Sequence, residues 1–134
     1  MPIQGAESVK LILFTKTIGH PACRHLMNSL DRMTVPFRVI TGRHALQDVM
    51  LKMRTDEALF VLLLLEVKDM EILNEMRPQI QDRKIITILP DDSEHSRSIG
   101  CSVLPRFQAL LSDDLSIVAE VAARIISIDS VGGH

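Results

Sequence analysis

Aromatic residues are scarce in this chain of 134 residues. It contains no Trp and no Tyr, and its 4 Phe residues account for the whole 3% of aromatic content. Proteins that stack on nucleic-acid bases, and cages that enclose quaternary amines, need several exposed aromatic rings. The composition therefore argues against both kinds of site. It also implies that the hydrophobic core is built from aliphatic side chains.

An excess of charge of one sign is missing as well. The chain has 15 Lys and Arg against 17 Asp and Glu, which gives a formal net charge of -2. A nucleic-acid backbone and an anionic membrane surface both attract proteins with a clear basic excess. We therefore expect no nucleic-acid partner and no membrane partner.

Long apolar runs are also lacking. The most apolar segment, residues 58–65, is far shorter than the roughly 20 residues of a membrane helix, and residues 1–10 contain no apolar stretch of signal-peptide length. The two cysteines, Cys23 and Cys101, are too few for a disulfide framework. These features predict a cytoplasmic protein in a reducing environment.

Short aliphatic runs alternate with longer amphipathic segments, which is typical of repeated βα units. Residues 59–65 are apolar at every position, as expected for a central parallel strand that helices cover on both faces. The pattern predicts five strands, at 9–14, 37–40, 59–65, 84–89 and 102–104. It favours one three-layer α/β/α domain with a five-stranded parallel sheet, whose core spans about 9–127 and whose tail, 128–134, is flexible.

The helices between these strands have recognisable starts and stops. Pro21 suits the first turn of the first helix, and Asp69 can cap a third helix that Pro78 interrupts. A polar segment, 91–99, is ended by Gly100, and the closing helix spans 115–126 after Ser112 or Asp113 as its cap.

Ligands of an open α/β sheet bind at the carboxyl ends of its strands. The predicted loops there are 15–21, 41–44, 66–69, 90–93 and 105–107. The first contains only one glycine, Gly19, and the chain has neither GxGxxG nor GxxxxGK[ST], so no cofactor is expected. The five His residues lack metal-binding spacing, and no GxSxG elbow occurs, so we predict no metal site and no serine nucleophile. A sensor of a small ligand at these loops remains an alternative.

Cys23 is the one candidate for a reactive thiol. It lies near the N-terminus of the first predicted helix, where the helix dipole lowers a thiol pKa, with His20 and His25 nearby. The segment 14–24 is somewhat similar to the entry loop of glutaredoxins, but His20 stands where the attacking cysteine belongs. A small thioredoxin-like or phosphocarrier enzyme that uses Cys23 is therefore the alternative function, and an incidental cysteine is the simpler interpretation.

The order and lengths of the elements, with the segment Gly100-Cys101-Ser102-Val103-Leu104-Pro105-Arg106-Phe107 before an amphipathic last helix, resemble a response-regulator receiver domain. The resemblance covers roughly residues 9–127. It implies a flavodoxin-like fold with strand order 2-1-3-4-5.

A working receiver holds magnesium with a pair of acids after its first strand and accepts a phosphoryl group on an Asp that ends its third strand. It also has a Ser or Thr after its fourth strand and a Lys after its fifth. In this sequence the matching positions carry other residues, namely Thr15 and Lys16, Glu66 or Val67, Leu89 or Pro90, and Pro105 with Arg106. The resemblance therefore implies a degenerate pseudo-receiver, a non-catalytic signalling or protein-interaction module that is not phosphorylated on Asp.

Two further expectations follow from that resemblance. Glu66 can be interpreted as a permanent mimic of a phosphorylated Asp paired with Arg106, or simply as the solvent-exposed end of a buried strand. The last helix and the residues Asp91, Asp92, Pro105 and Phe107 are expected to form a face for a protein partner or for self-association as a homodimer.

Overall fold

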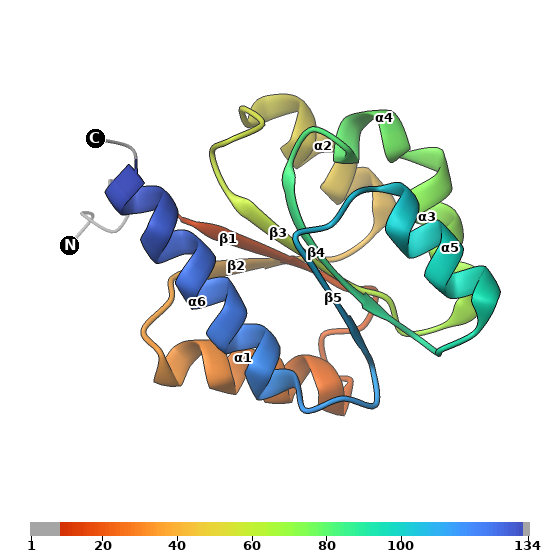
Figure 1. Ribbon diagram of the computed structural model, residues 1–134, viewed down its shortest axis with the longest axis horizontal. Helices are drawn as coiled ribbons and strands as arrows, with labels where there is room; N and C mark the ends of the chain where they lie inside the picture. Colours follow the sequence, from red (N-terminus) through yellow and green to blue (C-terminus); the bar gives the residue numbers. More distant parts are fainter. Residues whose placement is uncertain (1–8, 133–134) are drawn as a thin grey trace.

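The computed structural model describes residues 9–132, and these form one five-stranded parallel sheet in the order β2-β1-β3-β4-β5 (Figure 1). The predicted flavodoxin-like α/β fold is confirmed. The strands are β1 (Leu11–Phe14), β2 (Phe37–Ile40), β3 (Leu59–Leu63), β4 (Lys84–Leu89) and β5 (Phe107–Leu110).

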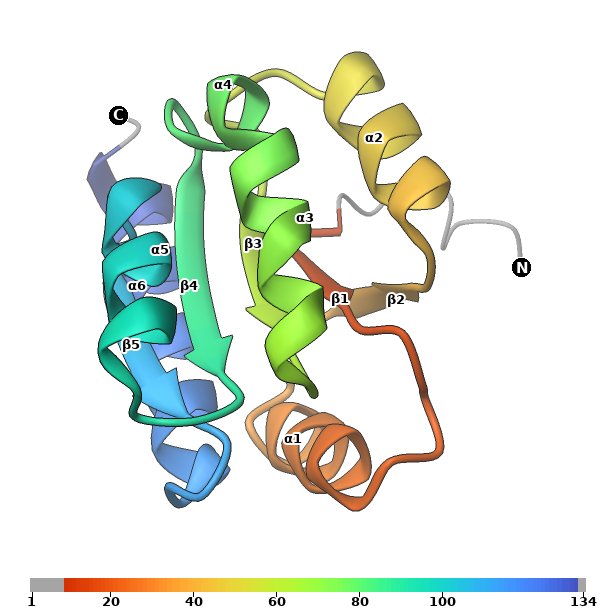
Figure 2. The ribbon, with the colours of Figure 1, turned by 90° about the vertical axis from the view of Figure 1, so that its right-hand side faces the viewer.

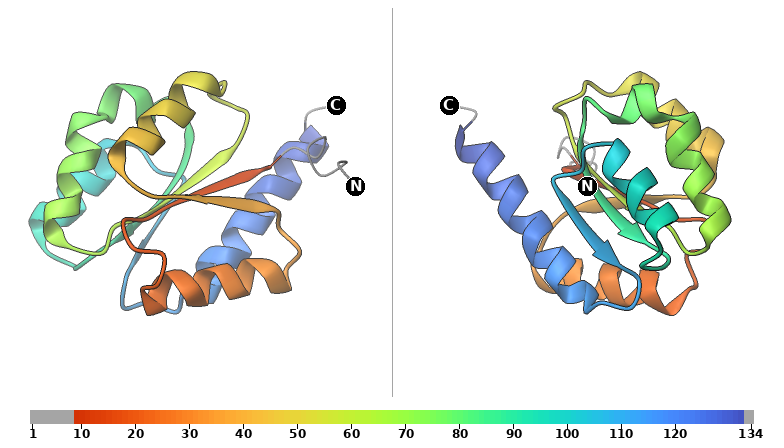
Figure 3. Two further views of the ribbon diagram at one scale, coloured as in Figure 1. Left: turned by 180° about the vertical axis from the view of Figure 1, so that it is seen from behind. Right: turned by 45° about the vertical axis from the view of Figure 1, so that its right-hand side comes forward.

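Helices cover both faces of the sheet (Figure 2). α1 (Pro21–Arg32) and α6 (Leu115–Gly132) pack together on one face. Both helices are visible in the left panel of Figure 3, where the molecule is seen from behind. The other face carries α2 (Arg43–Lys52), the 3-10 turn η2 (Val67–Asp69), α3 (Met70–Glu75), α4 (Arg77–Ile80) and α5 (Glu94–Ser102). α3 ends just before Arg77 and Pro78, so the predicted interruption is confirmed.

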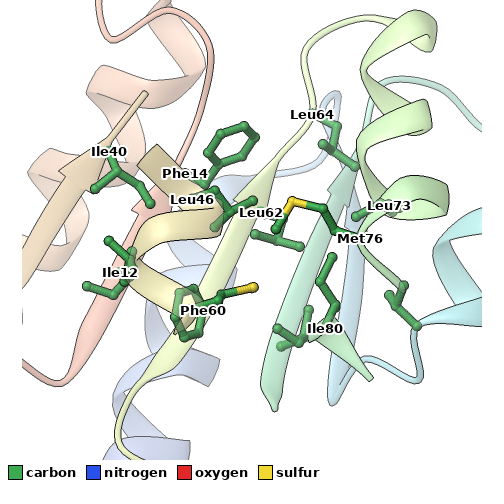
Figure 4. Packing of buried hydrophobic residues seen from close by; sticks show 14 of the residues in the cluster. Ile12, Phe14, Ile40, Leu46, Phe60, Leu62, Leu64, Leu73, Met76 and Ile80 are labelled. Atoms are coloured by element: carbon green, nitrogen blue, oxygen red, sulfur yellow. The ribbon is translucent and has the colours of Figure 1, made fainter. Parts of the chain in front are cut away.

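The central strand β3 divides the core into two layers. Phe60 and Leu62 join the layer under α2, α3 and α4, which Figure 4 shows, whereas Leu59, Val61 and Leu63 join the layer under α1 and α6. All five side chains are at most 1% exposed. Each such side chain contributes roughly 1.5–3 kcal/mol through burial. Burial on both faces explains why this strand shows no alternating pattern.

The prediction for the fifth strand is wrong. Residues 102–104 are not a strand; Ser102 closes α5, and its hydroxyl donates to the Ile99 carbonyl at 2.6 Å. Leu104 follows with a φ of 56°, and Pro105 has no N–H to donate, so neither extends a ladder. The strand begins at Phe107 instead. Gly100, which we expected to end the polar segment 91–99, lies within α5.

The closing helix begins at Leu115 as predicted, but its cap and its end differ from the prediction. α6 begins after Asp114, whose Oδ1 accepts the N–H of Ser116 at 3.0 Å, rather than after a cap at Ser112 or Asp113. Its helical backbone continues to Gly132, so the expected tail at 128–134 is helical as far as that residue, and 133–134 lie outside the described residues. Within the described part of the chain, no helix is both long and apolar enough to cross a membrane.

Candidate functional site

The loops that follow β1 and β3 meet at the carboxyl edge of the sheet because these two strands are neighbours. Lys16, in the loop after β1, forms an ion pair with the Glu66 carboxylate in the loop after β3. Its ammonium also lies 3.5 Å from Oδ1 of Asp69. The structure thus brings Lys16 and Glu66 together and adds Asp69, which the sequence suggested only as a helix cap.

Asp69 is almost buried, at 8% exposure, and its carboxylate serves the backbone. Its Oδ2 accepts the N–H of Glu66 at 3.0 Å and the N–H of Leu65 at 3.2 Å. These bonds hold the turn that leads into η2, and Oδ1 is left to face Lys16. Asp69 therefore fixes the loop and supplies the second negative charge around the ammonium.

Each member of the Lys16–Glu66 pair stabilises the charged form of the other. The hydrogen bond to Glu66 is the largest cause that raises the pKa of Lys16, and the same bond is the largest cause that lowers the pKa of Glu66. Lys68 adds a weaker positive charge, since its Nζ lies 3.9 Å from the other oxygen of Glu66. Both members of the pair are therefore charged throughout the neutral pH range.

Thr15, the other candidate after β1, is fully buried. Its backbone N–H donates to the Ile40 carbonyl at 3.2 Å, which extends the contact between β1 and β2. Its hydroxyl accepts the N–H of Thr17 at 3.4 Å. Thr15 therefore shapes the turn and does not present its hydroxyl at the edge of the sheet.

Glu66 does not occupy the position at the end of the third strand. β3 ends at Leu63, and Leu64 comes next, buried, with its N–H donating to the Ile88 carbonyl at 3.0 Å. Glu66 lies beyond Leu65 and immediately precedes η2. An unbroken aliphatic run gives no signal for its own end, so the sequence placed this strand end too late. After β4 the placement is as predicted, and Pro90 follows the strand.

Arg106 lies at the amino ends of the strands, whereas Glu66 lies at their carboxyl ends. Arg106 precedes β5, and its N–H donates to the carbonyl of Ile85 near the start of β4 at 2.7 Å. The interpretation that pairs Glu66 with Arg106 is therefore wrong, and so is the placement of Pro105 and Arg106 after the fifth strand. The alternative interpretation of Glu66, a solvent-exposed residue beyond a buried strand, agrees with its 53% exposed side chain. Leu111 follows β5 instead. The cause is the predicted position of the fifth strand. Because the strand begins at Phe107 and not at residue 102, Pro105 and Arg106 precede it instead of following it.

The residues expected to form one interaction face are also divided between the two edges. Pro105 and Phe107 lie at the amino end of β5, whereas Asp91 and Asp92 follow β4 at the carboxyl edge. Asp91 accepts hydrogen bonds from the Ser93 hydroxyl at 2.7 Å and its N–H at 3.1 Å, and the hydroxyl contact is the largest cause that lowers the pKa of Asp91. Asp92 pairs with Arg97 at 3.3 Å.

Cys23 lies on the inner face of α1 with no exposed surface. Burial raises the pKa of its thiol, whereas a nucleophilic thiol needs a lowered pKa and access to a substrate. The thiol contacts the sulfur of Met27 at 3.8 Å. His20 caps the helix, since its Nδ1 accepts the N–H of Ala22 at 3.0 Å. The surroundings of Cys23 therefore favour a structural role.

A hollow of about 590 Å³, which the sequence did not reveal, opens between α2 and α3 at the carboxyl edge. An ion pair between Arg43 and Glu75 joins the two helices there. The hollow is lined by Arg43, His44, Lys68, Asp69, Glu71, Ile72 and Glu75. Its charges of both signs are interspersed. Among the described residues, no three or more His, Cys, Asp and Glu side chains are grouped so that they could hold a metal ion.

The fold is shared with solved structures, although no protein-family model and no curated protein matches the sequence. A response regulator from Thermotoga maritima matches with a TM-score of 0.59 at 13% identity, over 89% of this chain and 98% of that chain. A chain from the RPS4 and RRS1 TIR domain heterodimer matches with a TM-score of 0.55 at 18% identity, over 88% of this chain and 95% of that chain. The fold of this protein thus resembles that of receiver and TIR signalling domains.

Proposed function

We propose that this protein is a non-catalytic signalling module that acts through protein contacts and does not accept a phosphoryl group. The observation that carries the proposal is the position of Lys16. Its ammonium lies between the carboxylates of Glu66 and Asp69, in the loops that follow the neighbouring strands β1 and β3. The crevice between those strands is where a doubly wound sheet of this order binds ligands.

The position of Lys16 disfavours phosphoryl transfer on electrostatic grounds. Transfer to a carboxylate requires a divalent cation that bridges the phosphoryl oxygens and the protein. The ammonium of Lys16 repels such a cation and occupies the carboxylates that would bind it. Asp69 has, in addition, committed one oxygen to two backbone N–H groups.

The residues that directly follow the strands do not supply the groups that phosphoryl transfer needs. Leu64 follows β3 and Pro90 follows β4, so neither a carboxylate nor a hydroxyl stands at those two positions. Leu111 follows β5, where no amine is available to neutralise a phosphoryl group. The fold itself supports an interaction role, because its structural neighbours include a response regulator and a domain solved as a heterodimer.

The test is incubation with acetyl phosphate and Mg²⁺, followed by measurement of the intact mass. We expect no added phosphoryl group, whereas a functional receiver domain treated in parallel should be modified. Glu66→Gln is the matched variant, and Asp56→Asn, a change at a carboxylate that is 79% exposed, controls for random modification of the surface. Magnesium-dependent phosphorylation of the wild type that Glu66→Gln abolishes and Asp56→Asn retains would overturn the proposal.

A further inference from the structure

The hollow between α2 and α3 has the volume of a small-molecule site. Its 590 Å³ falls within the roughly 300–1,000 Å³ of ligand pockets. Both helices lie on the same face of the sheet (Figure 2), and the hollow opens outside the carboxyl ends of the strands, where a doubly wound sheet binds ligands. Which ligand it can hold depends on the side chains that are free to contact one.

The two helices present opposite charges to this hollow, although its lining as a whole is mixed. α2 contributes Arg43 and His44, and its first turn contains no acid. α3 contributes Glu71 and Glu75, with the half-buried side chain of Ile72 as an apolar surface, and it contains no basic residue. Groups that attract an anion therefore face groups that attract a cation across the space.

The other two charged side chains of the lining are engaged elsewhere. Asp69 is committed to two backbone N–H groups, and the Lys68 ammonium lies 3.9 Å from a carboxylate of the neighbouring loop. Among the residues that the structure describes, by contrast, no ion pair includes His44 or Glu71. Each helix thus keeps one polar side chain available to a ligand.

The ion pair between Arg43 and Glu75 joins the two helices and can be exchanged for contacts with a ligand. Both side chains are 49% exposed, and an ion pair at such exposure contributes little to stability. A ligand with one sign of charge would engage one member of the pair and leave the other without a partner. A ligand with both signs replaces one ion pair by two.

We propose that the hollow binds a free α-amino acid with an aliphatic side chain. Its carboxylate contacts Arg43 and His44, its ammonium contacts Glu75 and Glu71, and its side chain packs on Ile72. A bound amino acid would join α2 to α3. The inference goes beyond the proposed interaction role, because that role requires no small-molecule ligand.

Titration with L-leucine, followed through the backbone amide resonances by NMR, tests this inference. We expect saturable shifts concentrated at residues 43–45 and 71–75, with a dissociation constant in the millimolar range or below. 4-Methylpentanoate lacks only the ammonium of leucine, and 3-methylbutylamine lacks only its carboxylate. Each should bind at least about tenfold more weakly, because it forms only one of the two ion pairs.

Two variants test the assigned contacts. Arg43→Gln and Glu75→Gln each remove one ion pair with the ligand and should each raise the dissociation constant of L-leucine at least about tenfold. Lys52→Gln, at the other end of α2 with a side chain that is 73% exposed, is the matched control for the lost cation. Asp56→Asn, at 79% exposure, is the control for the lost carboxylate. Both controls should bind like the wild type, and a thermal melt verifies that each variant is folded.

Three results would each overturn the inference. They are the absence of saturable shifts at tens of millimolar L-leucine, binding of 4-methylpentanoate or 3-methylbutylamine as tight as that of L-leucine, and unchanged affinity for L-leucine in Arg43→Gln or Glu75→Gln. Incubation with acetyl phosphate tests the proposed function separately. Phosphorylation of a protein that binds L-leucine as expected would contradict that proposal alone.

Discussion

Gly100 of α5 lies directly against the side chain of Gln108 in β5. A Cβ at position 100 would overlap Oε1 of Gln108 and would come within 2.9 Å of a methyl group of Leu89. The same Oε1 accepts a hydrogen bond from the buried hydroxyl of Thr87 in β4 at 2.9 Å, and Nε2 of Gln108 lies 3.7 Å from Sγ of Cys101. Gln108 thus occupies a narrow space between helix and sheet that exists because residue 100 has no side chain.

Gly100→Ala should therefore destabilise the protein although Ala is the better helix former. The gain in helix propensity is about 1 kcal/mol, whereas displacing Gln108 leaves the buried Thr87 hydroxyl without a partner at a cost of about 1–3 kcal/mol. We expect a net loss of about 1 kcal/mol in the free energy of unfolding, measured with urea. The same substitution in a Gln108→Ala background should be neutral or stabilising. A Gly100→Ala protein more stable than the wild type would contradict the observed packing.

Removal of the Lys16 ammonium should raise the pKa of Glu66. We expect Lys16→Met to shift the titration of the Glu66 carboxylate, followed by NMR, toward higher pH, because the hydrogen bond from Lys16 is the main cause of its lowered pKa. Lys68→Met should cause a smaller shift, since the Lys68 ammonium lies 3.9 Å from the carboxylate. Equal shifts in the two variants would contradict the assignment of the dominant partner.

The same pair should make stability depend on pH in a defined direction. The folded-state pKa of Glu66 is lowered, so its contribution is present above its unfolded pKa of about 4.3 and is lost as the pH falls through the lower folded value. The pKa of Lys16 is raised, so its contribution is complete below about 10.4 and is lost as the pH rises through the higher folded value. Unfolding curves of the wild type and Lys16→Met should thus differ most at neutral pH and converge at both extremes. Salt should reduce the difference, because solvent reaches both side chains, which are 30% exposed for Lys16 and 53% exposed for Glu66.

How far the sequence predicts this fold depends on how deeply each element is buried. β3 and β4 were found because their side chains are almost all buried and aliphatic. The sequence does not predict β5, because it is an edge strand of mixed character with Gln108 in its middle. In addition, Leu104, two residues after the end of α5, has a conformation that usually indicates glycine.

The candidate site was predictable only in part, for a related reason. The proximity of Lys16 to Glu66 depends on β1 and β3 being neighbours, which the strand order supplies once the fold is known. The participation of Asp69 depends on its bonds to two backbone N–H groups, which no sequence pattern specifies. The predicted fifth strand lies a few residues too early in the chain, and for that reason the sequence places Arg106 at the carboxyl end of the strand instead of the amino end.

The two cysteines should differ sharply in reactivity. Cys101 is exposed, whereas Cys23 is fully buried and its pKa is raised by burial. An alkylating reagent should modify Cys101 in the native protein and Cys23 only after unfolding or local opening. Cys101→Ser isolates the buried thiol, and its alkylation rate should rise steeply with urea. Rapid alkylation of Cys23 in native Cys101→Ser, with a pKa below the ordinary thiol value, would instead support the thiol-enzyme hypothesis.

Arg83, which immediately precedes β4, should contribute to the free energy of unfolding through the contacts of its guanidinium. Its guanidinium donates to the carbonyls of Gln79 at 3.1 Å, Arg54 at 3.2 Å and Met50, and it lies 5.6 Å from the centre of the Phe60 ring. The Met50 carbonyl belongs to the last turn of α2, where the helix itself provides no donor.

Arg83→Lys retains the charge, but a single ammonium cannot reach three carbonyls from the position of a planar guanidinium. We expect the free energy of unfolding in urea to fall by about 2 kcal/mol, because hydrogen bonds from a charged donor contribute about 1.5–3 kcal/mol. Amide hydrogen exchange at the end of α2 should accelerate in the same variant. Arg54→Lys, at a side chain that is 82% exposed, is the matched control and should change stability by less than about 0.5 kcal/mol. If Arg83→Lys behaves like that control, the three carbonyl contacts do not stabilise the fold, and the packing of Arg83 on Phe60 is the only contribution left to it.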